Sequence, residues 1–287
     1  MKKKVLALIL CAMMATTAVV GGTLAYFTDT EDEINVFTLG NVKIDLVEEQ
    51  RDDNGTALEE FEDNKVLLPI VGSAQGGTEN VGGYNLPTKE AAKNWVDKIV
   101  TVDNEGTQDA YVRVLFAFPD KMDDEQSAAE MMLHWNHDGS EPANTWKRMD
   151  AGTTVTLDGE VYNVYNYTYL PILNAKGEEG STTASPAITG VYIDSRVNAT
   201  VDANGAITYT MVNGRDETKN ATYAEGTAPK LYVLTQGVQA DGFADAEAAL
   251  AAGFGDPAAA NAENAALTNA QAWFNVVATG EREDITD

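Results

Sequence analysis

The sequence has little cysteine, little histidine and few cationic side chains. Cys11 is the only cysteine among 287 residues, and there are two histidines. Without a pair of cysteines the chain forms no internal disulfide, so its fold must be stabilised by burial and hydrogen bonding. Lysine and arginine number 19 against 45 aspartate and glutamate residues, a formal charge of −26. Binding to nucleic acid or to anionic lipid surfaces rests on clustered cations, so the composition argues against both.

The N-terminus has the composition of an export signal. Lys2–Lys4 form a positive segment, and the apolar run Val5–Ala15 follows it. Small residues before the cut favour cleavage after Ala25, which would leave a mature chain that begins at Tyr26. The apolar stretch ends at Val20, short of the roughly 20 residues that span a bilayer, so no stable membrane insertion is expected after cleavage. The cut removes the cysteine and three lysines, so the formal charge of the mature chain becomes −29.

Alternation of apolar and polar residues dominates the rest of the chain and predicts β-strands. The strands are expected at 41–47, 98–102, 110–118, 153–156, 161–170, around 200, and at 207–211, 231–238 and 273–278. Turn residues at 103–106, Asp158-Gly159 and Asn204-Gly205 predict three hairpins between neighbouring strands. The density of strands predicts an all-β fold, an antiparallel sandwich or barrel that forms a single domain over residues 26–287.

Short helices are expected as insertions between the strands. Thr88 is a predicted cap for a helix over 88–96, and 125–135 has helical propensity. The alanine-rich segments 244–252 and 258–272 favour two further helices. Residues 49–80 and 174–190 are rich in Gly, Ser, Thr, Asp and Glu, and they are predicted to be loops.

A specific pattern joins the export signal to the first strand, in the stretch GGTLAYFTDTEDEINVFTLGNVKIDL at residues 21–46. A glycine pair, a threonine, an apolar residue, an alanine, an aromatic residue and a short polar segment follow one another. This pattern resembles the N-termini of the TasA/camelysin family of proteins exported by Gram-positive bacteria, which carry SipW-type signal peptides read by a dedicated signal peptidase. The resemblance implies a processing site made by Gly21, Gly22, Thr23, Ala25 and Tyr26.

The resemblance is weaker elsewhere in the chain. Residues 98–113 look like the family's strand, turn and strand unit, and 231–239 look like a late core strand. Residues 119–225 match nothing recognisable, and we expect an elaborated insertion there. The resemblance implies an antiparallel jelly-roll-like β-sandwich. It also implies a secreted protein of the cell-surface matrix that assembles into biofilm fibres with itself and with related matrix proteins.

In that picture the freed N-terminus of one subunit adds as a strand to the next subunit. Residues 26–36 are the predicted donor strand, with Phe27, Ile34 and Val36 as its anchors. Main-chain hydrogen bonds supply affinity in such strand addition, and alternate side chains fix the register. The alternative is that the same segment pairs within its own sheet or frays.

Catalytic and metal-binding motifs are scarce. His134 and His137 would share one face of a helix and are the only candidate metal ligands among the histidines. The H-E-x-x-H motif of zinc peptidases is absent, so no catalytic residue is predicted, although camelysin-like relatives have been classed as metallopeptidases. A camelysin-like metallopeptidase and a monomeric adhesin or glycan-binding module therefore remain as alternatives. No cofactor is expected apart from Ca²⁺ on the acidic surface.

Four tyrosines lie along one predicted strand, at positions 162, 165, 167 and 169. They suit either an exposed stripe for carbohydrate or half-buried packing positions, and tyrosine in strands favours packing.

Overall fold

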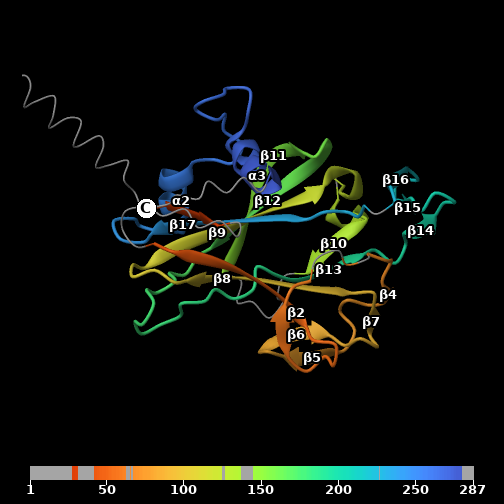
Figure 1. Cartoon of the computed structure of the whole chain (residues 1–287), viewed down its shortest axis with the longest axis horizontal. Helices are drawn as coiled ribbons and strands as arrows, with labels where there is room; N and C mark the ends of the chain where they lie inside the picture. Colours follow the sequence, from red (N-terminus) through yellow and green to blue (C-terminus); the bar gives the residue numbers. More distant parts are fainter. Residues whose placement is uncertain are drawn as a thin grey trace, which may run out of the picture.

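The protein is described by a computed structural model that covers residues 28–31, 42–62, 65, 67–124, 127–136, 145–225 and 227–279. Strands hold 46% of the residues and helices 11%, so the fold is mostly β. Two five-stranded antiparallel sheets form its centre, and short helices lie outside them (Figure 1). The predicted all-β sandwich with helical insertions is therefore confirmed.

The first sheet, sheet A, has the strand order β1-β17-β9-β12-β11. Its members are β1 (Thr28–Glu31), β9 (Ala110–Pro119), β11 (Trp146–Leu157), β12 (Glu160–Tyr169) and β17 (Tyr232–Gln239). The second sheet, sheet B, has the order β10-β13-β8-β2-β3. Its members are β2 (Ile44–Arg51), β3 (Leu58–Glu60), β8 (Val96–Asn104), β10 (Leu133–Asn136) and β13 (Ile188–Ile193). Residues 119–225 thus contribute four strands to the two main sheets.

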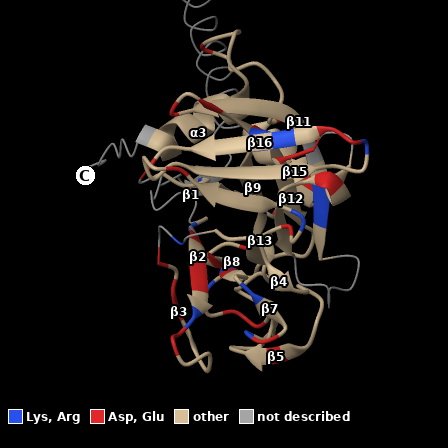
Figure 2. Ribbon diagram, turned by 90° about the vertical axis from the view of Figure 1, so that its right-hand side faces the viewer, with Lys and Arg blue, Asp and Glu red and all other residues tan. Residues whose placement is uncertain are grey.

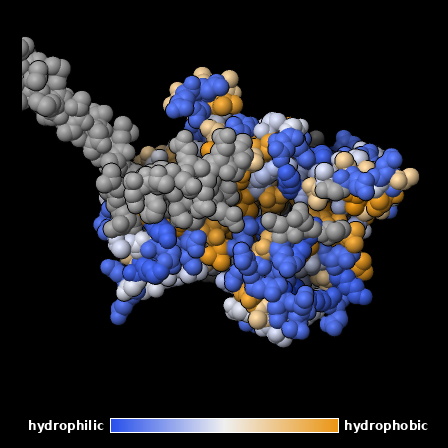
Figure 3. Space-filling view, in the orientation of Figure 1, coloured by the Kyte–Doolittle hydropathy of each residue, from blue (hydrophilic) through white to orange (hydrophobic). Residues whose placement is uncertain are grey.

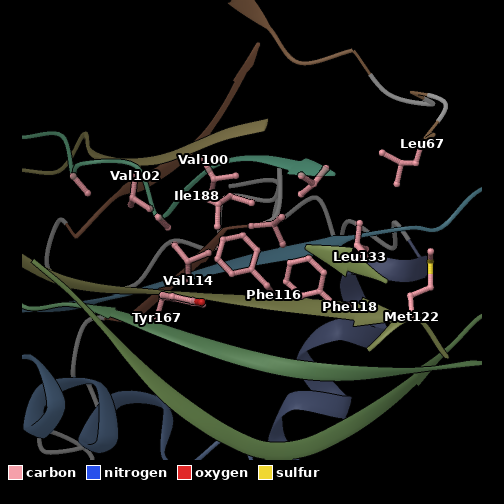
Figure 4. Close-up of a cluster of buried hydrophobic side chains, with 14 of the residues drawn as sticks. Leu67, Val100, Val102, Val114, Phe116, Phe118, Met122, Leu133, Tyr167 and Ile188 are labelled. Carbon is pink, nitrogen blue, oxygen red and sulfur yellow. The ribbon is translucent and has the colours of Figure 1, made fainter. Parts of the chain in front are cut away.

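The main hydrophobic core lies between the two sheets (Figure 4). Val100 and Val102 of β8 belong to it, as do Val114 and Phe116 of β9. The alternate residues of β9 all belong to this core, and they are Ala110, Val112, Val114, Phe116 and Phe118. All ten residues of β9 are buried, because its opposite face is also covered.

Two helices cover the outer face of sheet A. In α2 (Ala246–Phe254) the side chain of Asp245 caps the N-terminus by accepting from the N–H of Ala248, which confirms the helix expected over 244–252. In α3 (Asn269–Thr279) Phe274 is fully buried against sheet A.

The strand predicted at 273–278 is wrong, because this segment belongs to α3. Apolar side chains recur there at helical spacing, and they pack against Leu115 and Val164 of sheet A; they are Ala270, Trp273, Phe274 and Val277. The helix expected over 258–272 is also largely wrong, since turns occupy most of that segment and α3 begins at Asn269.

The hairpin predicted through 103–106 is wrong as well, because β8 and β9 belong to different sheets. The connection carries the chain from sheet B to sheet A. The Asn104 side chain holds it, donating to the carbonyls of Gln108 at 2.8 Å and Leu173 at 3.1 Å and accepting from the N–H of Gly106 at 2.9 Å. The residues at 103–106 are typical of a turn, but the connection that they form crosses the core to the other sheet.

The other two hairpins are confirmed. Asp158 and Gly159 both have positive φ, 51° and 80°, as the two-residue turn between β11 and β12 requires. The Asn204-Gly205 turn joins β14 (Asn198–Val201) to β15 (Ile207–Val212). Together with β16 (Thr218–Tyr223), these two strands make a separate three-stranded sheet.

Two predicted helices are replaced by short strands. The segment 88–96 contains β7 (Ala92–Lys93), which pairs with β4 (Val71–Gly72). The segment 125–135 contains the 3₁₀ turn η2 (Ala128–Glu130) and the start of β10. There Trp135 stacks on Phe118 with ring centroids 4.0 Å apart, so pairing and packing override helical propensity.

The segment between β2 and β8 is not the plain loop that was predicted. It holds β3, β4 and the pair β5 (Thr78–Val81) and β6 (Tyr84–Pro87), and another 3₁₀ turn, η1 (Asp120–Met122), follows β9. The guanidinium of Arg51 joins this segment to sheet B. It binds Asp97 at 2.7 and 2.9 Å, Glu79 at 2.6 Å and the carbonyl of Pro87 at 2.8 Å. Of the loop predicted over 174–190, residues 174–187 contain no named strand or helix, whereas 188–190 belong to β13.

Candidate assembly site

The N-terminal strand β1 is an edge strand of sheet A. Its four residues pair with the second half of β17, with Thr28 opposite Val238 and Glu31 opposite Thr235. On its other side β17 pairs with β9 along its whole length. Within the part of the chain that the structure describes, the first half of β17, at Tyr232–Leu234, therefore has a strand partner on one side only.

A groove lies beside this half of β17 and consists of two cavities that share four residues. The cavities measure about 630 and 550 Å³. The shared residues are Phe61, Lys98, Leu231 and Tyr232. The larger cavity reaches β2 of sheet B, and the smaller one is lined mainly by apolar side chains, among them Leu67, Val96, Val191 and Pro229. The groove therefore opens between the two sheets at the end where β17 begins.

Lys98 lies at the centre of the groove. Its residue exposure is only 7%, and its ammonium lies 2.7 Å from a carboxylate oxygen of Glu48 and 4.0 Å from the centre of the Phe61 ring. A buried cation of this kind is stabilised by its carboxylate partner and by the electron-rich face of the ring. Among the described residues that line the larger cavity, Lys98 is the one cation.

Acidic side chains surround the larger cavity. They are Asp45, Glu48, Glu49 and Glu60, which belong to β2 and β3 (red in Figure 2). Burial raises the pKa of Glu49, and the nearby charge of Asp103 raises it further. The groove thus combines apolar walls with one buried cation and a rim of carboxylates. Such a site suits an extended peptide better than a small neutral ligand.

The opposite edge of sheet A, strand β11, is closed to strand addition. A side-chain amide from α3 occupies the backbone groups of Thr156 on this edge. The register of β11 also shifts between Asp150 and Thr154, where Gly152 has a φ of +58°. Bulges and side-chain covers are common devices against edge-to-edge pairing. At Thr156 and at the bulge, these two features oppose the addition of a strand to β11.

All of the individual residues predicted for processing and assembly lie outside the described residues, as does one metal candidate. These are Gly21, Gly22, Thr23, Ala25, Tyr26, Phe27, Ile34, Val36 and, as a metal candidate, His137. Residues 28–31 are the described part of the predicted donor strand, and they pair within the same chain. That pairing is the alternative that the sequence left open, and it also shows which strand edge this segment fits.

His134 lies on β10 and packs against an aromatic side chain. Its ring stacks on Tyr192 with centroids 5.2 Å apart, and Nε2 lies 3.2 Å from a carboxylate oxygen of Asp194 without hydrogen-bond geometry. Burial lowers the pKa of His134, and the neighbouring charge of Asp194 opposes that shift. Within the described residues, no group of three or more His, Cys, Asp or Glu side chains is arranged to hold a metal ion.

The tyrosines of β12 are packing residues, as the strand pattern favoured. Tyr162, Tyr167 and Tyr169 are buried. Tyr165 is half-buried, and its hydroxyl donates to Asp123. They do not form an exposed stripe for carbohydrate.

The groove itself was not predicted from the sequence, although one signal for it was present. Lys98 has the same alternation phase as Val96, Val100 and Val102, which face the core or its edge. A lysine at a strand position where the alternation predicts an apolar residue indicates an interruption of the core. Phe61 carried no such signal, because it follows β3 in a segment that was interpreted as a loop.

Comparisons with known proteins agree with the N-terminal resemblance. The fold defines an antiparallel β-sandwich protein. A family model described as camelysin metallo-endopeptidase matches residues 1–51, so this part of the chain is similar to that family. No curated protein and no solved structure matches the chain. In the described residues, no helix is long and apolar enough to cross a membrane.

Proposed function

We propose that this chain is a secreted structural subunit of an extracellular fibre and that it assembles by N-terminal strand donation. The observation that carries the proposal is the pairing of β1 with β17, next to a groove between the sheets. A segment of four residues close to the predicted mature N-terminus can exchange its partner for the same strand edge of a neighbouring subunit. The hydrogen bonds lost within one subunit are regained in the next, as in domain swapping.

The groove would receive the part of the donor that follows β1. Ile34 and Val36 share one face of an extended strand and would enter the apolar part of the groove, near Val191 and Leu231. Burial of such a side chain contributes about 1.5–3 kcal/mol, so two anchors add substantially to the main-chain bonds.

The similarity of residues 1–51 to the camelysin family supports export and a location at the cell surface or outside the cell. In this proposal, a dedicated signal peptidase cleaves after Ala25, and cleavage sets the donor strand free. The match to the family model is restricted to this region, so the assembly mode rests on the geometry of β1 and its groove.

Truncation of the donor strand tests the proposal. Chains that begin at Tyr26 and at Thr38 are compared by negative-stain electron microscopy after mild acidification or addition of calcium. We expect filaments only from the longer chain. In the longer chain, Ile34→Asp should abolish filaments, whereas Asn35→Asp adds the same charge on the opposite face and should preserve them. Equal behaviour of the two truncations would refute strand donation and would favour a monomeric adhesin.

A metallo-endopeptidase is the second candidate, because that is the description of the matching family model. His134 and His137 are the residues to test, although burial of His134 against Tyr192 does not favour it as a ligand. Chelator-sensitive cleavage of a protein substrate that is lost in both His134→Ala and His137→Ala would establish this activity. Proteolysis that persists in both variants would point to a contaminant.

A further inference from the structure

The three-stranded sheet β14-β15-β16 ends in a short strand edge that carries neither a charged residue nor a proline. Among the described residues, β14 pairs only with β15, and it lies at the far right of the molecule in Figure 1. Natural edge strands are commonly protected by charged residues, by proline or by a covering segment. The four residues of β14, Asn-Ala-Thr-Val, have neither charge nor proline. Val201 is 68% exposed, the most exposed large apolar side chain in the described part of the chain.

The outer face of this sheet is uncharged and regular. Thr200, Thr208 and Thr222 form one row across the three strands, and Asn198, Thr210 and Asn220 form the next. The hydroxyls of Thr208 and Thr222 are 3.0 Å apart, and Thr210 donates to Asn220 at 2.8 Å. In a chain with a formal charge of −26, two copies can approach at such a surface without contact between like charges.

The direction of the backbone groups along β14 follows from its hairpin. The N–H of Asp202 donates to the carbonyl of Ala206 at 3.0 Å, and this bond closes the turn. Because hydrogen-bonded pairs alternate along an antiparallel ladder, Thr200 directs its N–H and C=O toward β15. Ala199 and Val201 therefore direct theirs away from the sheet, toward the free edge.

We infer that two copies of this chain pair antiparallel along β14, about a twofold axis at Thr200. Ala199 of each copy then lies opposite Val201 of the other, and about four main-chain hydrogen bonds form. The exposed Val201 side chain becomes covered by the other copy. The Thr200, Thr208 and Thr222 row continues across the axis into its counterpart, so that two small sheets become one sheet of six strands.

The flanking charges are compatible with this register. Asp202 lies opposite Asn198 of the second copy, and Arg196 lies opposite Asn204. Like charges directly opposite each other would destabilise a sheet, and none face each other across this pair. In the space-filling view, apolar atoms are exposed at this right-hand end of the molecule, among polar ones (Figure 3).

A pairing of four-residue strands is weak on its own. It buries far less than the roughly 800 Å² per partner of a standard stable interface. Repeated along an array of subunits, the same contact gains strength through multivalency. The contact is distinct from strand donation at β1 and does not depend on it, because β14 belongs to neither of the two main sheets.

Disulfide trapping tests the pairing directly. The chain from Tyr26 keeps every residue that the structure describes and contains no cysteine. In the proposed dimer the Thr200 residues of the two copies lie opposite each other as a non-hydrogen-bonded pair. Their Cα atoms are then about 4.5 Å apart, which is within the range for a disulfide. Under mild oxidation, Thr200→Cys should yield about tenfold more covalent dimer than Thr222→Cys, which lies in the same row but far from the axis.

A second pair of variants separates edge pairing from random collision. When Val201→Lys is combined with Thr200→Cys, the yield of covalent dimer should fall to that of Thr222→Cys, because a lysine on the edge opposes pairing. Val212→Lys adds the same charge at a valine that is 57% exposed at the other end of the sheet, and it should change nothing. Equal dimer yields from the two cysteine variants would overturn the inference, whether or not filaments form.

Discussion

The side-chain amide of Gln271 pairs with the backbone of Thr156 as a neighbouring strand would. Its Oε1 accepts from the N–H of Thr156 at 2.7 Å, and its Nε2 donates to the carbonyl of Thr156 at 3.1 Å. Thr156 lies on the outer edge of β11, so one residue of α3 occupies both groups that an added strand would use. A single glutamine thus directs strand addition away from one end of sheet A.

Removal of this amide should expose the edge of β11. Gln271→Ala leaves both backbone groups of Thr156 without their partner, and we expect a loss of about 1 kcal/mol in the free energy of unfolding. We also expect faster irregular aggregation, measured by light scattering. Gln271→Glu keeps the acceptor and should have an intermediate effect. If Gln271→Ala aggregates no faster than the parent chain, the amide does not protect the edge.

The buried ion pair between Arg51 and Asp97 should be important for stability. The two side chains are 3% and 10% exposed, and Asp97→Ala would leave the guanidinium with only Glu79 as an ionic partner. We expect a loss of about 3–5 kcal/mol in urea denaturation, as for other broken buried pairs. Glu79→Ala is the matched control. Its carboxylate is 40% exposed, so the loss should be about 1 kcal/mol or less. Similar losses in the two variants would contradict this ranking.

His134 should make stability depend on pH. Its pKa in the folded chain is lowered below the ordinary value of 6.5 by burial, so the unfolded chain binds more protons between the two values. Stability is then full above pH 6.5 and falls as the pH decreases toward the folded pKa. His134→Gln should flatten this part of the curve of unfolding free energy against pH. An unchanged slope in the variant would assign the acid sensitivity to another group.

Charge should control assembly. A formal −26, or −29 after the predicted cleavage, must be screened before acidic subunits can stack. We expect the sedimenting fraction of the chain from Tyr26 to rise with NaCl, with Ca²⁺ and at low pH. Ca²⁺ should act at lower ionic strength than NaCl if it bridges carboxylates. Sedimentation that is indifferent to all three conditions would exclude charge as the barrier.

Lys98 should matter for the groove more than lysines at its rim. Lys98→Met leaves the carboxylates of the larger cavity without their cation, so filament formation should require more salt. Lys230→Met is the control, because Lys230 is 59% exposed and pairs with Asp158 at the surface. The salt concentration at half-maximal filament formation distinguishes them. Equal shifts in both variants would mean that only net charge is being measured.

Local patterns predicted the strands well and their partners less well. Alternation located β9, β12, β15 and β17, and turn residues with positive φ located two hairpins. The turn after β8 was also recognised, but nothing local to 103–106 tells which sheet the next strand will join. That choice depends on β2, β12, β13 and β17, which lie far away in the sequence. Pairing with distant strands therefore determines which sheet the strand after the turn joins.

Packing also decided the type of the segment that forms α3. Trp273 and Phe274 have high strand propensity, yet the spacing of Ala270, Phe274 and Val277 places them on one face of α3 against sheet A. Of the candidate site, the N-terminal donor segment was visible in the sequence as a pattern. The groove was not, because its walls come from β2, β8, β17 and the residues that follow β3, which meet only in the folded chain.

The place of β17 has a consequence for the order of folding. Arg113 of β9 and Gln236 of β17 are joined by a 2.7 Å hydrogen bond across 123 positions of sequence, so sheet A cannot close until almost the whole chain is available. In a chain exported N-terminus first, β1 emerges earliest and its partner emerges among the last strands. For that interval β1 has no β17 of its own, and under the proposed strand donation it would pair with the β17 of a neighbour whose own β1 has been donated in turn.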